Sequence, residues 1–307
     1  MQVSPQALPV TCILPHMTGF ALILVICSAF AHASWNFLLK RGTNQEVFIW
    51  WFLVSTGVLL FPLGIALLLI YPVEGPGWWY ILGTALLHVL YFLFLGRGYA
   101  RGDLSVVYPI ARGSGPALVP LLGVLVLDET VTMAAVVGIG TIILGIFTVH
   151  WWGRFADILS NPTKILRAPG TRYGLLTGLL IATYSVWDKV GVSHVNPFLY
   201  MYGMTVGTAV FLTPYMVGTH GTTVLKREWA SAKVAIVASG LLTFLAYGLV
   251  LTALTTSKVS YVAPTREVGI VIGVLLGTLV LKEPFGGGRL IGSGLVLTGL
   301  VFVALAS

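Results

Sequence analysis

Charge is scarce in this sequence. Only 9% of its 307 residues are charged, 57% are hydrophobic, and the mean hydropathy is +0.95. Soluble domains carry about 25% charged residues, so the composition excludes an ordinary water-soluble fold. The apolar residues form runs of about 18 to 25, long enough as helices to cross a hydrocarbon core of roughly 30 Å. Because the runs show no alternation of apolar and polar residues, they indicate membrane helices and not barrel strands. An all-α integral membrane protein is predicted.

Cysteine and cofactor-binding motifs are also rare or missing. The two cysteines, Cys12 and Cys27, indicate neither a disulfide framework nor a metal site. No Gly-x-x-x-x-Gly-Lys-Ser/Thr loop occurs, which excludes a P-loop ATPase. The spaced glycines at 138 to 140 and 292 to 294 fall inside apolar runs, where they favour close helix packing over dinucleotide binding. No metal and no cofactor are predicted.

The net charge of +7 does not indicate nucleic-acid binding. The 17 Lys and Arg residues sit mostly in short loops between apolar runs and form no continuous basic face. Loops that flank membrane helices commonly collect such residues. The partner predicted from composition is therefore the lipid bilayer, and no nucleic acid is expected.

Ten segments of the chain are predicted to be membrane helices. They lie at about 17–39, 47–71, 77–96, 104–127, 131–151, 173–192, 197–218, 234–254, 260–281 and 289–306. The longest polar interval, 152–172, contains an Asn-Pro and a Pro-Gly pair, which are typical of a loop. It connects a first five-helix unit at 1–151 to a second at 173–307.

The two units are internal repeats. The segment LLGVLVLDE at 121–129 matches LLGTLVLKE at 275–283 with an offset of 154, which pairs Glu129 with Glu283 and then three glycines in the next helix of each unit. Nearer the start of each unit the offset is 152, and Trp35-Asn36 pairs with Trp187-Asp188. Because each unit has an odd number of spans, the second enters the membrane inverted. Ten transmembrane helices arranged as two inverted five-helix repeats are therefore predicted.

These features resemble the drug/metabolite transporter superfamily, and its ten-helix EamA family in particular. The resemblance rests on His32-Ala-Ser-Trp35-Asn36-Phe-Leu-Leu-Lys40, on the helix ends Leu127-Asp128-Glu129 and Leu281-Lys282-Glu283-Pro284, and on the glycine-spaced last helix of each unit. It implies an exporter or exchanger of small metabolites, multi-pass in the plasma (inner) membrane, and a monomer or weak homodimer. It also implies a central cavity between the units, formed mainly by helices 1, 3, 4, 6, 8 and 9.

The basic residues favour one orientation in the membrane. Of the 17 Lys and Arg residues, 13 fall in loops that follow odd-numbered helices, two fall on the other side and two lie within spans. The positive-inside rule therefore places the odd loops in the cytoplasm and both termini outside. The resemblance implies the opposite, because members of the superfamily generally have both termini in the cytoplasm.

Two arginines are the main candidates for substrate binding. Arg112 in YPIARGSGP and Arg266 in APTREVGI align at the offset of 154, each about one turn into a helix opened by proline. A charge within a span is costly unless it faces water or a partner, and a guanidinium binds carboxylate or phosphate bidentately. The pair favours an anionic or zwitterionic substrate. The alternative is structural: Arg266 pairs with Glu267 or Asp188, or both arginines extend toward headgroups. Glycines and prolines from Gly113 to Pro120 are expected to loosen the helix past Arg112.

Other polar and aromatic residues complete the candidate site. Glu267, Asp188 and His32 are candidates for proton coupling, although an interfacial ion pair of Asp188 with Lys189 is an equal alternative. The remaining candidates for the cavity wall are Trp35, Asn36, His88, Tyr91, Tyr99, Tyr184, Trp187 and Tyr247. Aromatic rings can stack on an amine or pack against an apolar side chain, but they also gather at membrane interfaces for structural reasons.

The leading prediction is a secondary transporter that exports or exchanges a small amino-acid-like or organic-anion metabolite by alternating access. Protons or a counter-substrate are the candidate coupled species. The first alternative is a proton-coupled exporter of cationic drugs, in which Glu267 or Asp188 binds the cargo. A membrane-embedded enzyme is disfavoured, because no metal-ligand cluster or nucleophile constellation is apparent. A channel is also disfavoured, because no filter-like loop occurs.

Overall fold

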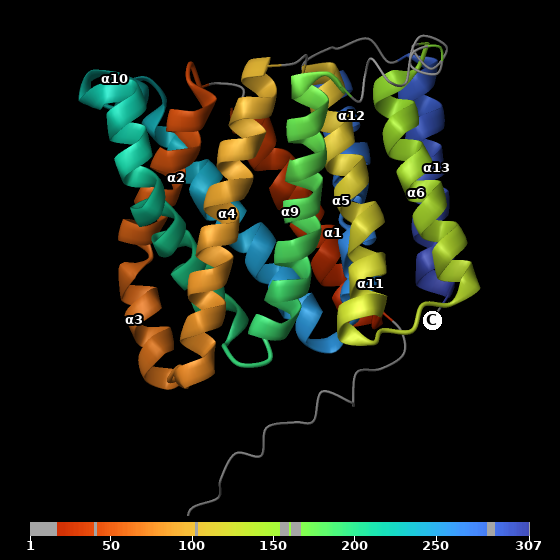
Figure 1. Ribbon diagram of the computed structural model, residues 1–307, viewed down its shortest axis with the longest axis horizontal. Helices are drawn as coiled ribbons and strands as arrows, with labels where there is room; N and C mark the ends of the chain where they lie inside the picture. Colours follow the sequence, from red (N-terminus) through yellow and green to blue (C-terminus); the bar gives the residue numbers. More distant parts are fainter. Residues whose placement is uncertain are drawn as a thin grey trace, which may run out of the picture.

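The computed structural model describes residues 17–39, 42–101, 104–153, 160, 167–280 and 286–306. The helices are α1 (Gly19–Leu39), α2 (Gln45–Leu59), α3 (Phe61–Ile70), α4 (Gly75–Arg101), α5 (Leu104–Leu127), α6 (Met133–Trp151), α9 (Pro169–Gly191), α10 (Pro197–Thr256), α11 (Val259–Thr265), α12 (Val268–Val280) and α13 (Gly287–Leu305). They form one bundle, with α6 and α13 at one edge and α3 and the reversal of α10 at the other (Figure 1).

The bundle is apolar outside and carries its polar groups inside. Leu125, Leu279 and Leu305 are 68%, 75% and 77% exposed, whereas the side chains of Asp188 and Glu267 are buried. Among the described residues, seven helices are long and apolar enough to cross a membrane, or eight if the bent pair of α2 and α3 is one span. The prediction of a multi-pass, all-helical membrane protein is confirmed.

Helix ends recur at the offsets found in the sequence. Helices α2 and α10 begin at Gln45 and Pro197, 152 residues apart, and each is capped by an asparagine side chain. Asn44 accepts from the third helical residue, and Asn196 accepts from two amides of the first turn. Helices α6 and α13 begin 154 residues apart. The same local structure is thus built twice.

Two pairs of glycines show how equivalent helices of the two repeats meet. A Cβ atom added at Gly138 would lie 2.8 Å from the carbonyl oxygen of Gly299, and one added at Gly145 would lie 2.8 Å from that of Gly292. At the offset of 154, Gly292 is equivalent to Gly138 and Gly299 to Gly145, so the two contacts are related by symmetry. Such crossed pairing is expected for two antiparallel helices about a pseudo-twofold axis, and it brings the backbones of α6 and α13 together.

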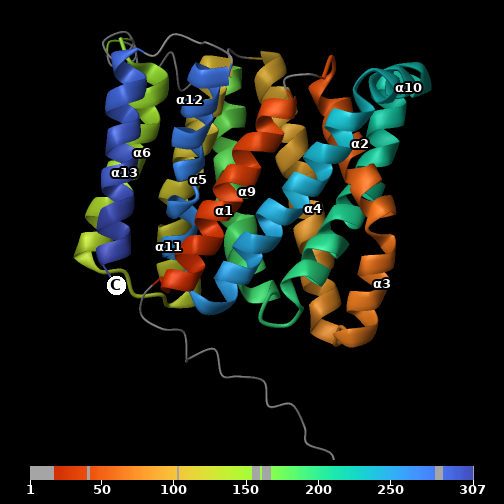
Figure 2. The same cartoon turned by 180° about the vertical axis from the view of Figure 1, so that it is seen from behind.

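The first helix of each repeat packs on the other repeat. Helix α1 lies against α10 and α12, and α9 lies against α4 and α5 (Figure 2). Ala29 of α1 packs with Val268 of α12, and the indole of Trp187 in α9 donates to the carbonyl of Tyr80 in α4. The two repeats are therefore interlocked and do not stand side by side.

Two predicted helices differ from the observed ones in shape. The segment at 47–71 is divided into α2 and α3, which meet at an angle of 58° near Leu60. Pro62 lies in the first turn of α3, where it has no N–H to donate and its ring displaces the preceding turn. The segments at 197–218 and 234–254 are two limbs of α10, residues 197–220 and 233–256, and α10 reverses direction between them (Figure 1). Two non-helical residues, Gly221 with φ 71° and Ala232 with φ −133°, bound the connection, which is helical and not the expected loop.

The expected loosening past Arg112 does not break the helix there, and the break occurs in the other repeat. Helix α5 is continuous from Leu104 to Leu127 although it contains three prolines, which membrane helices tolerate where neighbouring groups satisfy the freed backbone carbonyls. The equivalent helix is broken between α11 and α12 at Arg266 and Glu267. The end of the predicted 152–172 loop also differs, because Pro169 and Gly170 form the first turn of α9, where proline is favourable.

Candidate functional site

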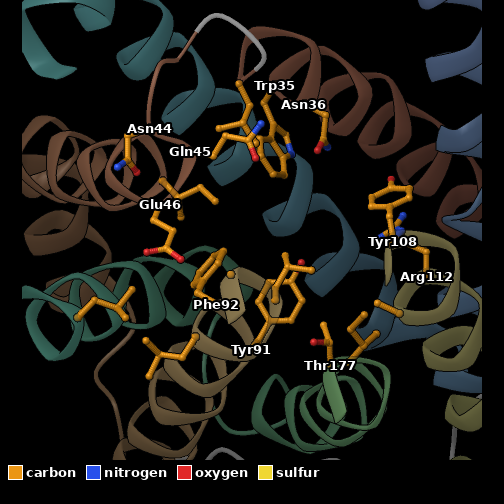
Figure 3. Close-up of a pocket in the computed structure, with 18 of the residues that line it drawn as sticks. Trp35, Asn36, Asn44, Gln45, Glu46, Tyr91, Phe92, Tyr108, Arg112 and Thr177 are labelled. Atoms are coloured by element: carbon orange, nitrogen blue, oxygen red, sulfur yellow. The ribbon is translucent and has the colours of Figure 1, made fainter. Parts of the chain in front are cut away.

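A cavity of about 370 Å³ lies among α1, α2, α4, α5, α9 and the first limb of α10 (Figure 3). Its polar wall includes His32, Asn36, Asn44, Glu46, Arg112 and Thr177, and its aromatic wall includes Trp35, Tyr91, Phe92, Tyr108 and Tyr215. This volume and the mixture of apolar rings with a few polar groups are typical of a small-molecule site.

The helices that form this cavity differ in part from those that the resemblance implied. Helices 1, 3, 4 and 6 of the predicted series contribute, as α1, α4, α5 and α9. Helices 8 and 9 do not, and α2 and the first limb of α10 line the wall instead. The cavity reaches the end of the bundle where α1 and α4 finish and α2 begins. Arg97, Arg101 and Arg172 lie at that same end.

Arg112 lies in the cavity wall and is paired with Glu267 across the repeat interface. Its Nη2 is 2.9 Å from Oε2 of Glu267, and the two side chains are 14% and 5% exposed. The Nε atom of Arg112 is buried without a hydrogen-bond partner among the described residues. Because a guanidinium has five N–H groups, the ion pair leaves donors for a second acceptor.

Arg266 occupies a different environment from its repeat mate. Its guanidinium carbon lies 5.2 Å from the ring centre of Tyr247, in a cation–π contact, and Arg266 does not line the cavity. The local pairing of Arg266 with Glu267 or Asp188 that the sequence left open is not found, because Glu267 contacts Arg112 instead. The two arginines thus have different partners: a carboxylate for Arg112 and an aromatic ring for Arg266.

Asp188 belongs to a buried cluster outside the cavity wall. It accepts hydrogen bonds from the hydroxyls of Tyr200, at 2.8 Å, and Tyr247. The ion pair with Lys189, which the sequence left as an alternative, is not found, because the Lys189 amine donates to two backbone carbonyls at the end of α10, at 2.5 and 2.9 Å. An ammonium that caps a helix C-terminus satisfies the last carbonyls, which explains why Lys189 turns away from Asp188.

His88 joins this buried cluster to the cavity. Its ring lies 4.4 Å from that of Tyr184, 5.8 Å from that of Tyr247 and 6.2 Å from that of Tyr91, measured between ring centres. Its Nδ1 atom interacts with Thr84 one turn earlier in α4. Of these candidates, only Tyr91 lines the cavity.

The C-terminal end of α1 contributes three predicted residues to the wall. His32, Trp35 and Asn36 all line the cavity, and the indole of Trp35 donates to Nδ1 of His32 at 3.2 Å. The Asn36 amide donates to the carbonyl of His32 at 2.8 Å, one helical turn earlier. Because these contacts are within one helix, they fix the orientation of the side chains toward the cavity.

Two other aromatic residues, Trp187 and Tyr99, were also predicted to line the cavity. Trp187 packs against Gly83 of α4 and does not line the cavity, so its observed contacts join helices. Tyr99 lies in α4, but its side chain is outside the described residues. Within the described residues, no group of three or more His, Cys, Asp and Glu side chains could hold a metal ion.

The sequence did not single out two acidic residues near the mouth of the cavity. Glu46 lines the wall and its Oε2 lies 3.1 Å from Nε2 of His220. Glu228 is buried and accepts hydrogen bonds from the amides of Thr43 and Asn44, at 3.0 and 3.1 Å. Glu46 lies next to the predicted start of a helix and Glu228 lies in the predicted connection between two helices, where a charge is common and gives no distinctive signal.

The opposite end of the bundle is closed by contacts between the repeats. The carboxylate of Glu129 accepts hydrogen bonds from the amides of Val259 and Ser260, at 2.8 and 3.0 Å, and so caps α11. The Lys258 amine donates to the carbonyl of Thr130 at 2.8 Å. The cavity therefore approaches one end of the bundle while the other end is held shut.

Comparisons with known proteins agree with this architecture. A model of the EamA-like transporter family matches residues 19–151 and 169–305. No curated protein matches the chain. One solved crystal structure superposes with a TM-score of 0.74 at 16% sequence identity, covering 94% of this chain and 99% of that chain. At this identity the likeness shows the fold alone.

Proposed function

The chain belongs to the EamA-like transporter family, and from that premise we propose that it is a secondary transporter of a small amino-acid-like or organic-anion metabolite. Alternating access, with the cavity opening in turn to each side of the plasma (inner) membrane, is the proposed mechanism. The observation that carries the proposal is the cavity itself: it adjoins the interface of two repeats, one end of the bundle is closed, and Arg112 stands in its wall.

Arg112 is the proposed anchor for the acid group of the substrate. Its side chain is within the wall, its charge is fixed, and its Nε has no partner among the described residues. A substrate carboxylate or phosphate can accept from the guanidinium donors that Glu267 does not occupy. Arg266 is the proposed counterpart for the state that opens to the other side, because it holds the equivalent position in the second repeat.

Ten spans in an inverted arrangement are the proposed topology. In this proposal α2 and α3 form one bent span, α11 and α12 form one broken span, and the two limbs of α10 and α9 are three separate spans. The repeated helix boundaries and the reversal between the two limbs of α10 support it. The proposed orientation puts the arginine-rich end in the cytoplasm. A reporter fused to Ser307 that is active only in the cytoplasm would overturn this orientation.

A competition assay in proteoliposomes tests the function. Labelled amino acids and organic acids are offered singly, and unlabelled amino acids, organic acids, phosphorylated metabolites and quaternary amines compete with any that is taken up. We expect anionic or zwitterionic compounds to compete best and Arg112→Gln to abolish their advantage. Arg97→Gln is the matched control, because Arg97 is exposed at the end of α4 and does not line the cavity. Competition that is unchanged in Arg112→Gln contradicts the proposed role of Arg112.

Glu267 is the proposed proton carrier. A substrate carboxylate that binds the remaining donors of Arg112 shares the guanidinium with Glu267 and weakens their ion pair, and in this proposal Glu267 then takes up the proton. In the alternative function, a proton-coupled exporter of cations, Glu46 supplies a negative group in the cavity wall. Quaternary amines that compete better than carboxylates would favour that alternative.

A further inference from the structure

We propose that Glu46 forms the amine end of the substrate site, so that the preferred cargo is an elongated zwitterion with its ammonium at Glu46 and its acid group at Arg112. This inference rests on the proposed transport function and narrows its substrate class. It follows from three features of the cavity: the charge on Glu46, the places of the two charged residues, and the nature of the wall between them.

The surroundings of Glu46 leave its negative charge available. The Asn44 amide lies 3.4 Å from Nδ1 of His220, and Nε2 of His220 lies 3.1 Å from Oε2 of Glu46. Because the Asn44 amide donates to Nδ1, a neutral His220 carries its hydrogen on Nε2 and donates it to Glu46. Within the described residues, no Lys or Arg pairs with Glu46 and its Oε1 accepts no hydrogen bond.

The backbone next to Glu46 is shaped to admit its carboxylate. A Cβ atom added at Gly96 would lie 2.3 Å from Oε1 and 3.1 Å from Cδ of Glu46. Glycine at position 96 in α4 therefore makes room for this carboxylate at the wall. The side chain of Glu46 is 33% exposed, which gives a cationic group access to it.

The two charged residues lie on opposite sides of the cavity. Figure 3 shows Glu46 on one side and Arg112 on the other, with Trp35, Tyr91 and Phe92 between them. A molecule whose amine and acid group are attached to one carbon, such as an α-amino acid, carries both charges at the same end, whereas the two charged residues face the cavity from opposite sides. A molecule with an amine at one end and an acid at the other matches that arrangement.

The middle of the cavity suits the middle of such a molecule. The rings of Trp35, Tyr91 and Phe92 offer apolar surface to a chain of methylene or aryl groups. Phe92 lies beside Glu46 in Figure 3, where its ring face can also attract an ammonium. Because the site has one acidic end, one basic end and an apolar middle, it binds such a molecule in one orientation.

Binding of matched probes to the purified full-length protein tests the inference. The probes are straight-chain ω-amino acids of four to eight carbons and, at the best length, the α-amino isomer with the same formula, the carboxylate without the amine, and the amine without the carboxylate. Affinities are measured by calorimetry for the wild type, Glu46→Gln and the control Glu74→Gln. Glu74 is an exposed carboxylate outside the cavity.

We expect the best ω-amino acid to bind about tenfold or more tightly than its α-amino isomer and than the simple carboxylate. Glu46→Gln is expected to remove that advantage and leave binding of the simple carboxylate within about twofold of wild type. Glu74→Gln is expected to behave as wild type.

The failures of the two proposals are distinguishable. Carboxylates that bind and are transported, with no preference for the ω-amino acid or with one that Glu46→Gln leaves intact, overturn the zwitterion inference and leave the transporter proposal standing. A folded wild-type protein that binds and transports no anionic or zwitterionic compound overturns both.

Discussion

The ion pair between Arg112 and Glu267 allows a quantitative test of how the repeats are joined at the cavity. The perturbation is a double-mutant cycle of Arg112→Gln, Glu267→Gln and both together. The two charged atoms lie 2.9 Å apart and the side chains are 14% and 5% exposed. Each single variant therefore leaves one charge in the bundle without its partner, whereas the double variant leaves neither.

The distance and burial set the expected magnitude. With an effective dielectric constant of about 20, two unit charges 2.9 Å apart attract by about 6 kcal/mol. Breaking such a buried pair by removing one partner costs about 3–5 kcal/mol, most of it from the charge left behind. The double variant removes that cost, so its loss of stability is expected to be no larger than that of either single variant. The coupling energy expected from the cycle is about 4 kcal/mol.

The assay is reversible chemical unfolding of the purified protein in detergent, followed by tryptophan fluorescence. Arg97→Gln is the control for loss of a positive charge, and as an exposed substitution it is expected to change the free energy of unfolding by less than about 0.5 kcal/mol. Losses in Arg112→Gln and Glu267→Gln that add within about 0.5 kcal/mol in the double variant would refute the reasoning, since additivity means that the two charges do not interact.

Two further predictions concern packing and loop anchoring. Gly299→Ala would place a Cβ 2.5 Å from the carbonyl oxygen of Gly138 and is expected to cost about 1–3 kcal/mol in the same unfolding assay, whereas Gly140→Ala meets nothing within 4 Å and is expected to be neutral or stabilising. An equal effect of both substitutions would show that the contact between α6 and α13 is not tight. Glu228→Ala leaves two loop amides without their acceptor and is expected to cost about 2–5 kcal/mol, with faster hydrogen exchange at residues 42–44, while Glu74→Ala leaves exchange there unchanged. Unchanged exchange in Glu228→Ala would contradict the proposed anchoring.

The membrane class and the repeats could be predicted because they depend on local pattern. Run length and apolar content locate a span without knowledge of its neighbours, and spaced residues such as Trp35-Asn36 and Trp187-Asp188 reveal the duplication. The family prediction is confirmed by the match over both repeats. The bend near Leu60 also has a local cause in Pro62, although a proline alone does not determine an angle.

The composition of the site depends on contacts that the sequence pattern does not contain. Arg112 and Glu267 are paired because α5 and the break between α11 and α12 meet in space, and no periodicity shows which of several carboxylates faces an arginine. Glu46 escaped notice because a carboxylate in the first turn of a helix is ordinarily explained by the helix dipole. The binding and proton-coupling roles of the predicted site residues remain predictions.

The packing of the first helix of each repeat on the other repeat has a consequence for how the protein is made. Helix α1 rests on α10 and α12, and the amide of Thr18 donates to the hydroxyl of Ser257, 239 residues further along the chain. At a synthesis rate of about 5–20 residues per second, α1 waits on the order of 10 to 50 seconds in the bilayer before its neighbours emerge from the ribosome. During that interval the nascent first repeat lacks both α9 and the helices that cover α1. A first repeat made without the second therefore leaves uncovered the faces of α1 that α10 and α12 contact in the complete bundle.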